Sequence, residues 1–212
     1  PEQRAIRVQL SPRRYTTLAA EIGAKVSSLP IPEGGAFKQG QLLVAFDCSI
    51  HAAQYQKAQA ALSAAQTVMR ANERLDQLNS VGRMELDVSR AEVDKNRAEL
   101  AAMGATLSKC RVAAPFNGRI ADQKVREQQF VQPGQAVLDI LDDSALELEF
   151  IVPSRWLTWL KPGHRFNAAI DETRKTYPVR LLRIAAKADP VSQTVKCVGV
   201  VDGRYPDLLA GM

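Results

Sequence analysis

The sequence predicts a mainly β protein of elongated, modular shape, in which a long α-helical coiled-coil hairpin splits a β-sandwich and a small β-barrel completes the chain. Three observations support this fold class. Strand-like segments lie at both ends of the 212 residues. Between them, residues 49–109 contain no proline and are rich in alanine, which favours helix. A short sequence that precedes this stretch is repeated after it.

Composition places the chain among ordinary globular proteins. It is 46% hydrophobic and 24% charged, which suits roughly one to three small domains. The formal net charge is +5, but the basic residues are scattered and form no long run, so we expect no nucleic-acid partner. The sequence has no membrane-length apolar run and no leader-like start, and it stops on turn residues at 208–212, so we expect it to belong to a longer protein.

The first segment, residues 6–47, is expected to be β. It contains the strand-like stretches IRVQL, YTTLAAEIGAKV and QLLVAF, which are separated by prolines and by glycines typical of turns. The helical stretch follows, and from residue 111 the strand pattern returns and continues to the end.

Seven-residue spacing of apolar side chains predicts how the helices pack. In the second half of the helical stretch this series is Leu86, Val93, Leu100 and Leu107. In the first half we expect the contact to follow Ala61, Val68 and Leu75, together with Ala64, Ala71 and Leu78. Such 3,4 spacing is typical of helices that wrap around each other. One bent helix in an ordinary bundle is the alternative, but the flanking strands leave no further helices for a bundle.

A turn near residue 81 would make these helices antiparallel, because residues 79–82 (NSVG) are poor helix formers. Cys48 and Cys110 lie at similar distances on either side of this turn, so both should lie at the base of the hairpin. In an oxidising compartment they could form a disulfide if their Cα atoms come within about 4.4 to 6.8 Å. Two reduced, half-buried thiols are the alternative, and Cys197 is expected to be an ordinary strand residue.

Neither a metal site nor an active site is predicted. His51 follows Cys48 by three residues, but the other histidine, His164, lies in a distant segment. The sequence has no Ser/His/Asp set, no HExxH motif and no phosphate-binding loop. We therefore expect no metal, no cofactor and no catalysis.

The repeated sequence is FKQGQLLVAFD at residues 37–47 and VQPGQAVLDIL at residues 131–141. Two copies of one β unit can pack face to face, because each copy alone would expose its apolar side to water. We therefore expect both copies to share a single core, although they lie far apart in the sequence.

These motifs resemble a known family. Residues 23–43 contain GAKV, then EG, then FKQGQLL, an order similar to half of a lipoyl or biotinyl domain. A lipoyl domain split by a helical hairpin resembles the periplasmic adaptor proteins, also called HlyD-like membrane fusion proteins, of tripartite efflux pumps. The sequence AAPFNG at residues 113–118 resembles the strand with which that family re-enters its lipoyl domain. DPVSQT at residues 189–194 and LLAGM at residues 208–212 resemble its late barrel segments.

The resemblance implies a layout of three domains. The β-barrel would comprise residues 1–12 and 142–212 and be incomplete at its C-terminus, the lipoyl-like domain residues 13–47 and 111–141, and the hairpin residues 48–110. An enzyme-type carrier needs a lysine at the turn between the lipoyl halves, and the hairpin replaces that turn here, so we expect no attached cofactor. The membrane-proximal domain and the anchor of the family are expected in parts that this sequence does not include.

In many adaptors the hairpin tip carries an arginine, a leucine four residues later and a serine seven residues beyond, and it contacts an outer-membrane channel. Arg74 and Leu78 have this separation, but Glu85 takes the place of the serine, so the channel and the tip register stay open. An exposed cation and an apolar side chain can also dock between partner helices without the motif. We expect the partner-binding tip to consist of Arg74, Leu78, Ser80, Val81, Gly82 and Arg83. The alternative is that Arg74 is a solvated helix residue and Leu78 closes the contact between the helices.

The remaining strands, over residues 146–152 and from residue 165 onwards, are expected to form the barrel with residues 4–10 as its first strand. Between them, SRWLTWL predicts a short helix that is capped by Ser154 and carries Trp156, Trp159 and Leu160 on one face. A membrane-interface helix is the alternative, but so short a helix buries little, so we expect it to cover the end of the barrel.

The resemblance implies an adaptor in the periplasm, anchored to the inner membrane, that assembles into a ring as a trimer or hexamer. It would link an inner-membrane transporter to an outer-membrane channel. A proton-driven transporter of the resistance-nodulation-division (RND) type and a role in multidrug resistance are favoured, with an ATP-driven (ABC) transporter as the alternative. A different class of function stays open, namely a periplasmic protein that binds a substrate or metal ion and delivers it to a transporter.

Overall fold

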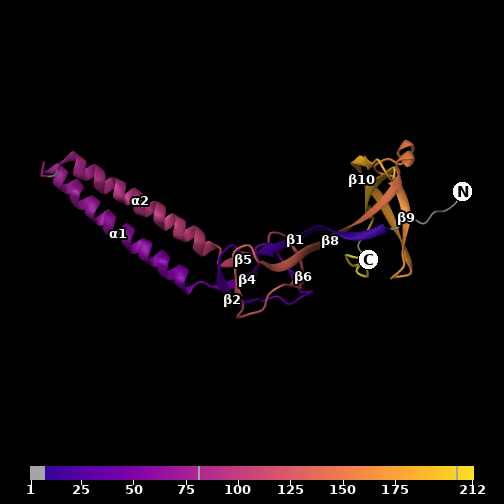
Figure 1. Cartoon of the computed structure of the whole chain (residues 1–212), viewed down its shortest axis with the longest axis horizontal. Coiled ribbons are helices and arrows are strands. Elements are labelled where there is room, and N and C mark those ends of the chain that lie inside the picture. Colours follow the sequence, from indigo (N-terminus) through magenta and orange to yellow (C-terminus); the bar gives the residue numbers. More distant parts are fainter. Residues whose placement is uncertain (1–7, 81, 204) are drawn as a thin grey trace.

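The computed structural model describes residues 8–80, 82–203 and 205–212 and shows an elongated molecule with three parts in a row (Figure 1). A helical hairpin forms one end, a compact β domain lies in the middle, and a second β domain forms the other end. Each β domain contains its own cluster of buried apolar residues. Residues 4–7 of the expected first barrel strand and Val81 of the expected tip lie outside the described residues. Within the described part, neither helix has the length and hydropathy that a membrane span requires.

Two antiparallel helices form the hairpin. Helix α1 spans Ser49–Gln77 (29 residues) and α2 spans Arg83–Ser108 (26 residues), so they extend about 44 and 39 Å at about 1.5 Å per residue. A Schellman motif ends α1: Asn79 has a left-handed φ of 53°, and the N–H of Ser80 donates to the carbonyl of Leu75 at 2.8 Å. At these lengths the hairpin is a short one, so the expectation of a long hairpin is corrected. The helices are shorter than the predicted helical stretch because α1 already ends at Gln77 and α2 begins only at Arg83.

The contact surface on α2 agrees with the predicted series. Leu86 and Val93 are buried, and Leu100 and Leu107 are half-buried. Ser89 is also buried, and its hydroxyl donates to the carbonyl of Leu86 at 2.8 Å, which satisfies this polar group inside the contact.

The contact surface predicted for α1 is wrong by one residue. Ala61, Val68 and Leu75 are all exposed, with 55% and 41% exposure for the latter two. The buried or half-buried residues keep the 3,4 spacing but fall one position later along the chain, at Leu62, Ala65, Met69 and Asn72. The alanine-rich helix satisfies the 3,4 pattern along two neighbouring stripes, and α2 can cover one of them. Leu78 is 71% exposed, so the interpretation that it closes the helix contact is also wrong.

Both halves of the sequence build the middle domain together. One sheet has the strand order β5-β4-β2-β7, and the facing sheet contains β3, β6, β8 and β1. These strands are β1 (Val8–Ala19), β2 (Ala24–Ser28), β3 (Ala36–Phe37), β4 (Leu42–Asp47), β5 (Arg111–Ala113), β6 (Gly118–Gln123), β7 (Phe130–Val131) and β8 (Ala136–Pro153). β3 from the first copy of the repeat pairs with β6, and β7 from the second copy pairs with β2. Each copy of the repeat therefore supplies strands to both sheets.

A single core fills the space between the two sheets. Phe37, Leu43 and Phe46 from the first copy lie in the same buried cluster as Val131 and Ile140 from the second. As the repeat predicts, the two copies share one core. Neither copy could bury its apolar face alone, which explains why the hairpin can be inserted between them without dividing the domain.

The second β domain is built on the far ends of two strands from the middle domain. β1 and β8 pair along most of their length, and a register shift between Pro12 and Arg14 marks the point where β1 passes from one core to the other. The sheet continues through β11 (Thr194–Val201), β10 (Lys175–Asp189) and β9 (Arg165–Ile170). Leu10 and Leu148 lie in this second core, and Cys197 is a free, fully buried thiol within it. Closure of this sheet into a small barrel stays a prediction.

The segment after β8 forms one 3₁₀ turn, η1 (Ser154–Thr158). Its N-cap is Pro153 and no side chain caps it, so the predicted capping by Ser154 is wrong. Trp156 packs against the second core and Leu160 is buried, but Trp159 is half exposed. Because a 3₁₀ helix has about three residues per turn, Trp159 lies next to Trp156, with 5.3 Å between the ring centroids. About half of the surface of Trp159 stays outside the core.

Candidate partner-binding site

The tip of the hairpin presents apolar side chains to solvent. Leu78 follows α1 and is 71% exposed, and Met84 in the first turn of α2 is 81% exposed. Met84 was not among the expected tip residues, because these ended one residue earlier, at Arg83. A large apolar residue directly after the expected turn was the available signal. Large apolar side chains at such exposure are suited to being covered by a partner.

Charged and polar groups surround these apolar side chains. Arg74 lies in the last turn of α1, Arg83 begins α2, and Glu85 lies in the first turn of α2. A cation at a helix C-terminus and an acid at a helix N-terminus both match the helix dipole, so Glu85 stabilises the start of α2. The hydroxyl of Ser80 donates to the carbonyl of Leu78 at 3.2 Å and so belongs to the turn itself.

Gly82 is the N-cap of α2 and has an extended conformation. Arg74 and Leu78 lie at the end of α1 and Arg83 begins α2, so these residues flank the turn between the two helices. The structure therefore gathers the described members of the expected tip around one turn. They offer a cation beside apolar side chains, a combination that can enter a groove between two partner helices.

The base of the hairpin is tied to the middle domain. Cys48 and Cys110 form a disulfide, with 6.1 Å between their Cα atoms. Cys110 belongs to the core of the middle domain and Cys48 packs against it. An ion pair joins Lys109, just after α2, to Glu21 at 2.6 Å. Both ends of the hairpin are thus attached to one body, which limits how far the tip can swing.

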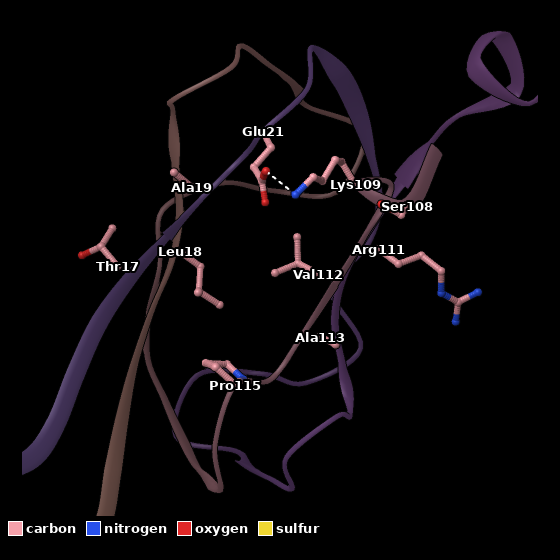
Figure 2. A pocket seen from close by; sticks show the side chains of 10 residues that line it. All are labelled: Thr17, Leu18, Ala19, Glu21, Ser108, Lys109, Arg111, Val112, Ala113 and Pro115. Carbon is pink, nitrogen blue, oxygen red and sulfur yellow. Dashed lines mark ion pairs between the residues drawn. The ribbon is translucent and has the colours of Figure 1, made fainter. Parts of the chain in front are cut away.

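A hollow of about 400 Å³ lies beside this base, between the edge strands β1 and β5 (Figure 2). Leu18, Val112 and Pro115 line its apolar part, and the Glu21–Lys109 ion pair lies on one side (Figure 2). Arg111 points away from the hollow. Its ten lining residues include no histidine or cysteine, and the Glu21 and Lys109 side chains among them pair with each other.

His51 is a single imidazole near the base of α1. Its Nδ1 is buried and has no hydrogen-bond partner within the described part of the chain. In the same residues, no three His, Cys, Asp or Glu side chains gather in a way that could hold a metal ion. Cys48, the thiol closest in sequence, is used in the disulfide.

The middle domain contains a buried carboxylate on β8. Asp139 is 5% exposed and accepts hydrogen bonds from the hydroxyls of Thr17 at 2.6 Å and Tyr15 at 2.8 Å. The ammonium of Lys124 lies 3.1 Å from the same carboxylate. The hydrogen bond from Thr17, followed by those from Tyr15 and Lys124, lowers the pKa of Asp139 below its usual value. This network joins β1 and the segment after β6 to β8.

We expect Asp139→Asn to lower the free energy of unfolding by about 1 to 3 kcal/mol at pH 7, because the charged acceptor of three donors is lost. Since the folded pKa is depressed, the ionised carboxylate stabilises the fold above the unfolded pKa of about 3.9, and this stabilisation is lost as pH falls through the folded pKa. Urea unfolding of both proteins at pH 7 and at about pH 3 should therefore show a difference that shrinks in acid.

Asp143→Asn on the same strand is the matched control. Asp143 is exposed and pairs with the exposed Arg119, so its loss should cost less than about 1 kcal/mol. Equal losses for the two variants, or a loss for Asp139→Asn that does not change with pH, would contradict the assigned role of Asp139.

No protein-family model matches the chain. An uncharacterized protein of Haemophilus influenzae is 28% identical over 174 residues, covering 82% of this chain and 46% of that protein. Nodulation protein NolF of Rhizobium meliloti is 29% identical over 222 residues, covering 96% of this chain and 59% of NolF. The chain therefore spans about half the length of the curated relatives it matches.

Solved structures match along nearly the whole chain. A MacA–MexA chimera that contains the α-hairpin domain of Pseudomonas aeruginosa MexA superposes with a TM-score of 0.85 at 19% identity, covering 98% of this chain and 77% of the chimera. The membrane fusion protein Spr0693 of Streptococcus pneumoniae R6 superposes with a TM-score of 0.81 at 16% identity, covering 98% and 95%. At such identities the likeness concerns the fold. The chain has the fold of the membrane fusion proteins and periplasmic adaptor proteins, as the resemblance in its motifs predicts.

Proposed function

We propose that this chain is the connecting part of a periplasmic adaptor, which links an inner-membrane transporter to an outer-membrane channel for export. The observation that carries this proposal is the hairpin: its base is tied to a β domain by a disulfide, and its tip exposes Leu78, Met84 and Arg74. An arm held at its base and apolar at its tip is suited to docking with a distant partner.

The two ends of the molecule differ in structure, which fits two different partners at opposite ends. The tip would contact the channel, and the second β domain would face the transporter (Figure 1). β1 begins in that domain, and the N–H of Leu10 donates to the carbonyl of Met212 there at 2.7 Å. An anchor to the inner membrane would therefore attach at the end of the molecule that lies away from the tip.

The finer assignments follow the same resemblance. We propose that several copies form a ring, as a trimer or hexamer, around the export path. An RND transporter is favoured over an ABC transporter, and multidrug export is the expected role. The Cys48–Cys110 bridge agrees with a location in the oxidising periplasm.

Photo-cross-linking in cells tests the channel contact. A photoreactive amino acid at Leu78 of the full-length protein is expected to capture an outer-membrane channel, identified by mass spectrometry. The same group at Gln56, an exposed α1 residue nearer the base, serves as the matched control and should capture no channel. Equal capture at both positions, or capture of no outer-membrane protein at Leu78, would contradict the proposal.

A further inference from the structure

One short segment of the second β domain combines aromatic and basic residues with no acid. Residues 154–165, with the sequence SRWLTWLKPGHR, contain two tryptophans, two arginines, a lysine and a histidine, but no aspartate or glutamate. The whole chain has 23 acidic residues against 28 lysines and arginines, so the excess of cations here is local. The segment consists of η1 and the loop that joins it to β9.

The tryptophans of this segment have different environments. Trp156 packs against the second core and Leu160 is buried, so these two side chains cover the end of the domain. Trp159 stacks on Trp156 and is 51% exposed. The ring of His164 meets the ring of Trp159 edge-on, with 5.5 Å between the centroids, which favours one position of the indole. Trp159 is therefore held at the surface, where a partner can contact it.

A second apolar side chain lies in the neighbouring turn. Val191, between β10 and β11, is 92% exposed. The N–H of Ser154 donates to the carbonyl of Gln193 at 2.8 Å, so this turn contacts the start of η1. The acid of the turn, Asp189, accepts hydrogen bonds from the N–H groups of Val191 at 2.9 Å and Ser192 at 2.8 Å. Its carboxylate is thus used to shape the turn.

Two cations belong to the same surface. Arg155 and Lys161 are exposed, and neither makes an ion pair within residues 8–80, 82–203 and 205–212. The ammonium of Lys161 donates only to the carbonyl of Leu157, at 2.8 Å. We call Arg155, Trp159, Lys161 and Val191 the η1 patch. An exposed indole with cations that lack acidic partners is typical of protein surfaces that lie on anionic membranes.

The η1 patch lies at the end of the molecule away from the hairpin. β8 pairs with β6 in the middle domain at residues 138–141 and with β11 in the second domain at residues 147–153. It therefore leads away from the hairpin and ends where η1 begins. In the proposed adaptor this end faces the inner membrane (Figure 1). Because charges are screened over about 10 Å at 0.1 M salt, these cations can attract only a surface that lies close to them.

We propose that the η1 patch rests on a lipid bilayer that contains anionic phospholipid. The indole of Trp159 lies in the interfacial region, which suits an apolar ring with one polar N–H, and Arg155 and Lys161 lie among the phosphate groups. So short a helix buries too little to anchor a protein, and the patch instead orients an adaptor that is already anchored. The inference rests on the proposed adaptor function, which supplies the membrane. The surface of a transporter is the competing occupant.

A spin label tests the contact with lipid. Full-length protein with Val191→Cys is labelled with a nitroxide and reconstituted into vesicles of phosphatidylethanolamine and phosphatidylglycerol. Oxygen concentrates in lipid and a nickel chelate stays in water, so the ratio of their effects on the label reports lipid contact. Cys48 and Cys110 are bridged and Cys197 is buried, so within the described residues only the introduced thiol reacts. The full-length protein keeps every membrane-proximal part in place.

Thr176→Cys is the matched control. Thr176 is exposed on β10 of the same domain and pairs with Ala169, near the end of β9 that lies away from η1. We expect the oxygen-to-nickel ratio to be several-fold higher at position 191 than at position 176. Replacing both Arg155 and Lys161 by glutamine should reduce this difference. Vesicles of phosphatidylcholine alone, which carry no net charge, should reduce it as well.

Equal ratios at positions 191 and 176 would overturn the inference, as would a difference that neither the glutamine substitutions nor the neutral vesicles reduce. A label at position 191 that loses access to both reagents, and only when the transporter is present in the vesicles, would show a protein partner and overturn it too. Channel capture at Leu78 without lipid contact would overturn this inference and leave the adaptor function standing. Lipid contact without channel capture would contradict the adaptor function and leave the lipid-binding patch standing.

Discussion

Replacing both Cys48 and Cys110 by serine is expected to lower the free energy of unfolding by about 4 kcal/mol. The bridge joins residues with a sequence separation of 62, and closing a loop of that length removes about this much conformational freedom from the unfolded chain. The effect should appear as a lower urea midpoint in equilibrium unfolding. It should also loosen the arms at their base, where the bridge holds both helices to the middle domain.

A reductant provides the control within the same experiment. Dithiothreitol should lower the midpoint of the unsubstituted protein to that of the double variant and leave the double variant unchanged. Cys197 stays in both proteins, so it cannot account for a difference between them. If the unsubstituted protein unfolds at the same urea concentration with and without reductant, the bridge does not stabilise the hairpin base.

Gly118→Ala should destabilise the middle domain by about 3 kcal/mol, although it adds a single methyl group. A Cβ at Gly118 would overlap the backbone carbonyl oxygen of Leu141, and it would lie 3.3 Å from the ring of Phe37. Backbone cannot move aside as a flexible side chain can. β6 would therefore have to shift away from β8, at the place where the two copies of the repeat meet.

Gly23→Ala is the matched control for this prediction. A Cβ at Gly23 would lie 3.6 Å from the nearest atom, a Pro133 carbon, which is an ordinary van der Waals distance. We expect a change of less than about 0.5 kcal/mol. Thermal unfolding of both variants should separate them clearly, and similar stability of the two would contradict the close approach of β6 to β8.

The sequence was sufficient to predict the features that depend on composition and repetition. The absence of proline and the abundance of alanine delimited the helices, and the repeated KQGQ and QPGQ segments predicted a shared core. The resemblance to the adaptor family singled out Arg74 and Leu78, which lie in the last turn of α1 and at its C-cap. Symmetry about the turn brought Cys48 and Cys110 together, but sequence alone left their oxidation state open.

The details that the sequence did not predict depend on choices between equivalent patterns. On α1 two stripes, one residue apart, both contain apolar residues at 3,4 spacing, and the position of α2 decides which is covered. The exposure of Met84 and Val88 has the same origin, since they lie outside the covered series. Nor did local residues show that β1 and β8 run through both β domains as continuous strands, because alternation looks the same in either core.

The most direct test of the account is whether one assembly contains partners from both membranes. Full-length protein cross-linked at Leu78 to its channel would be purified through a tag on the channel, and the sample would be searched for an integral inner-membrane transporter. The account predicts that both this chain and a transporter are recovered, and that Leu78→Asp in place of the cross-linker abolishes both. Recovery of this chain with the channel but never with an inner-membrane transporter would contradict the claim that it connects the two membranes.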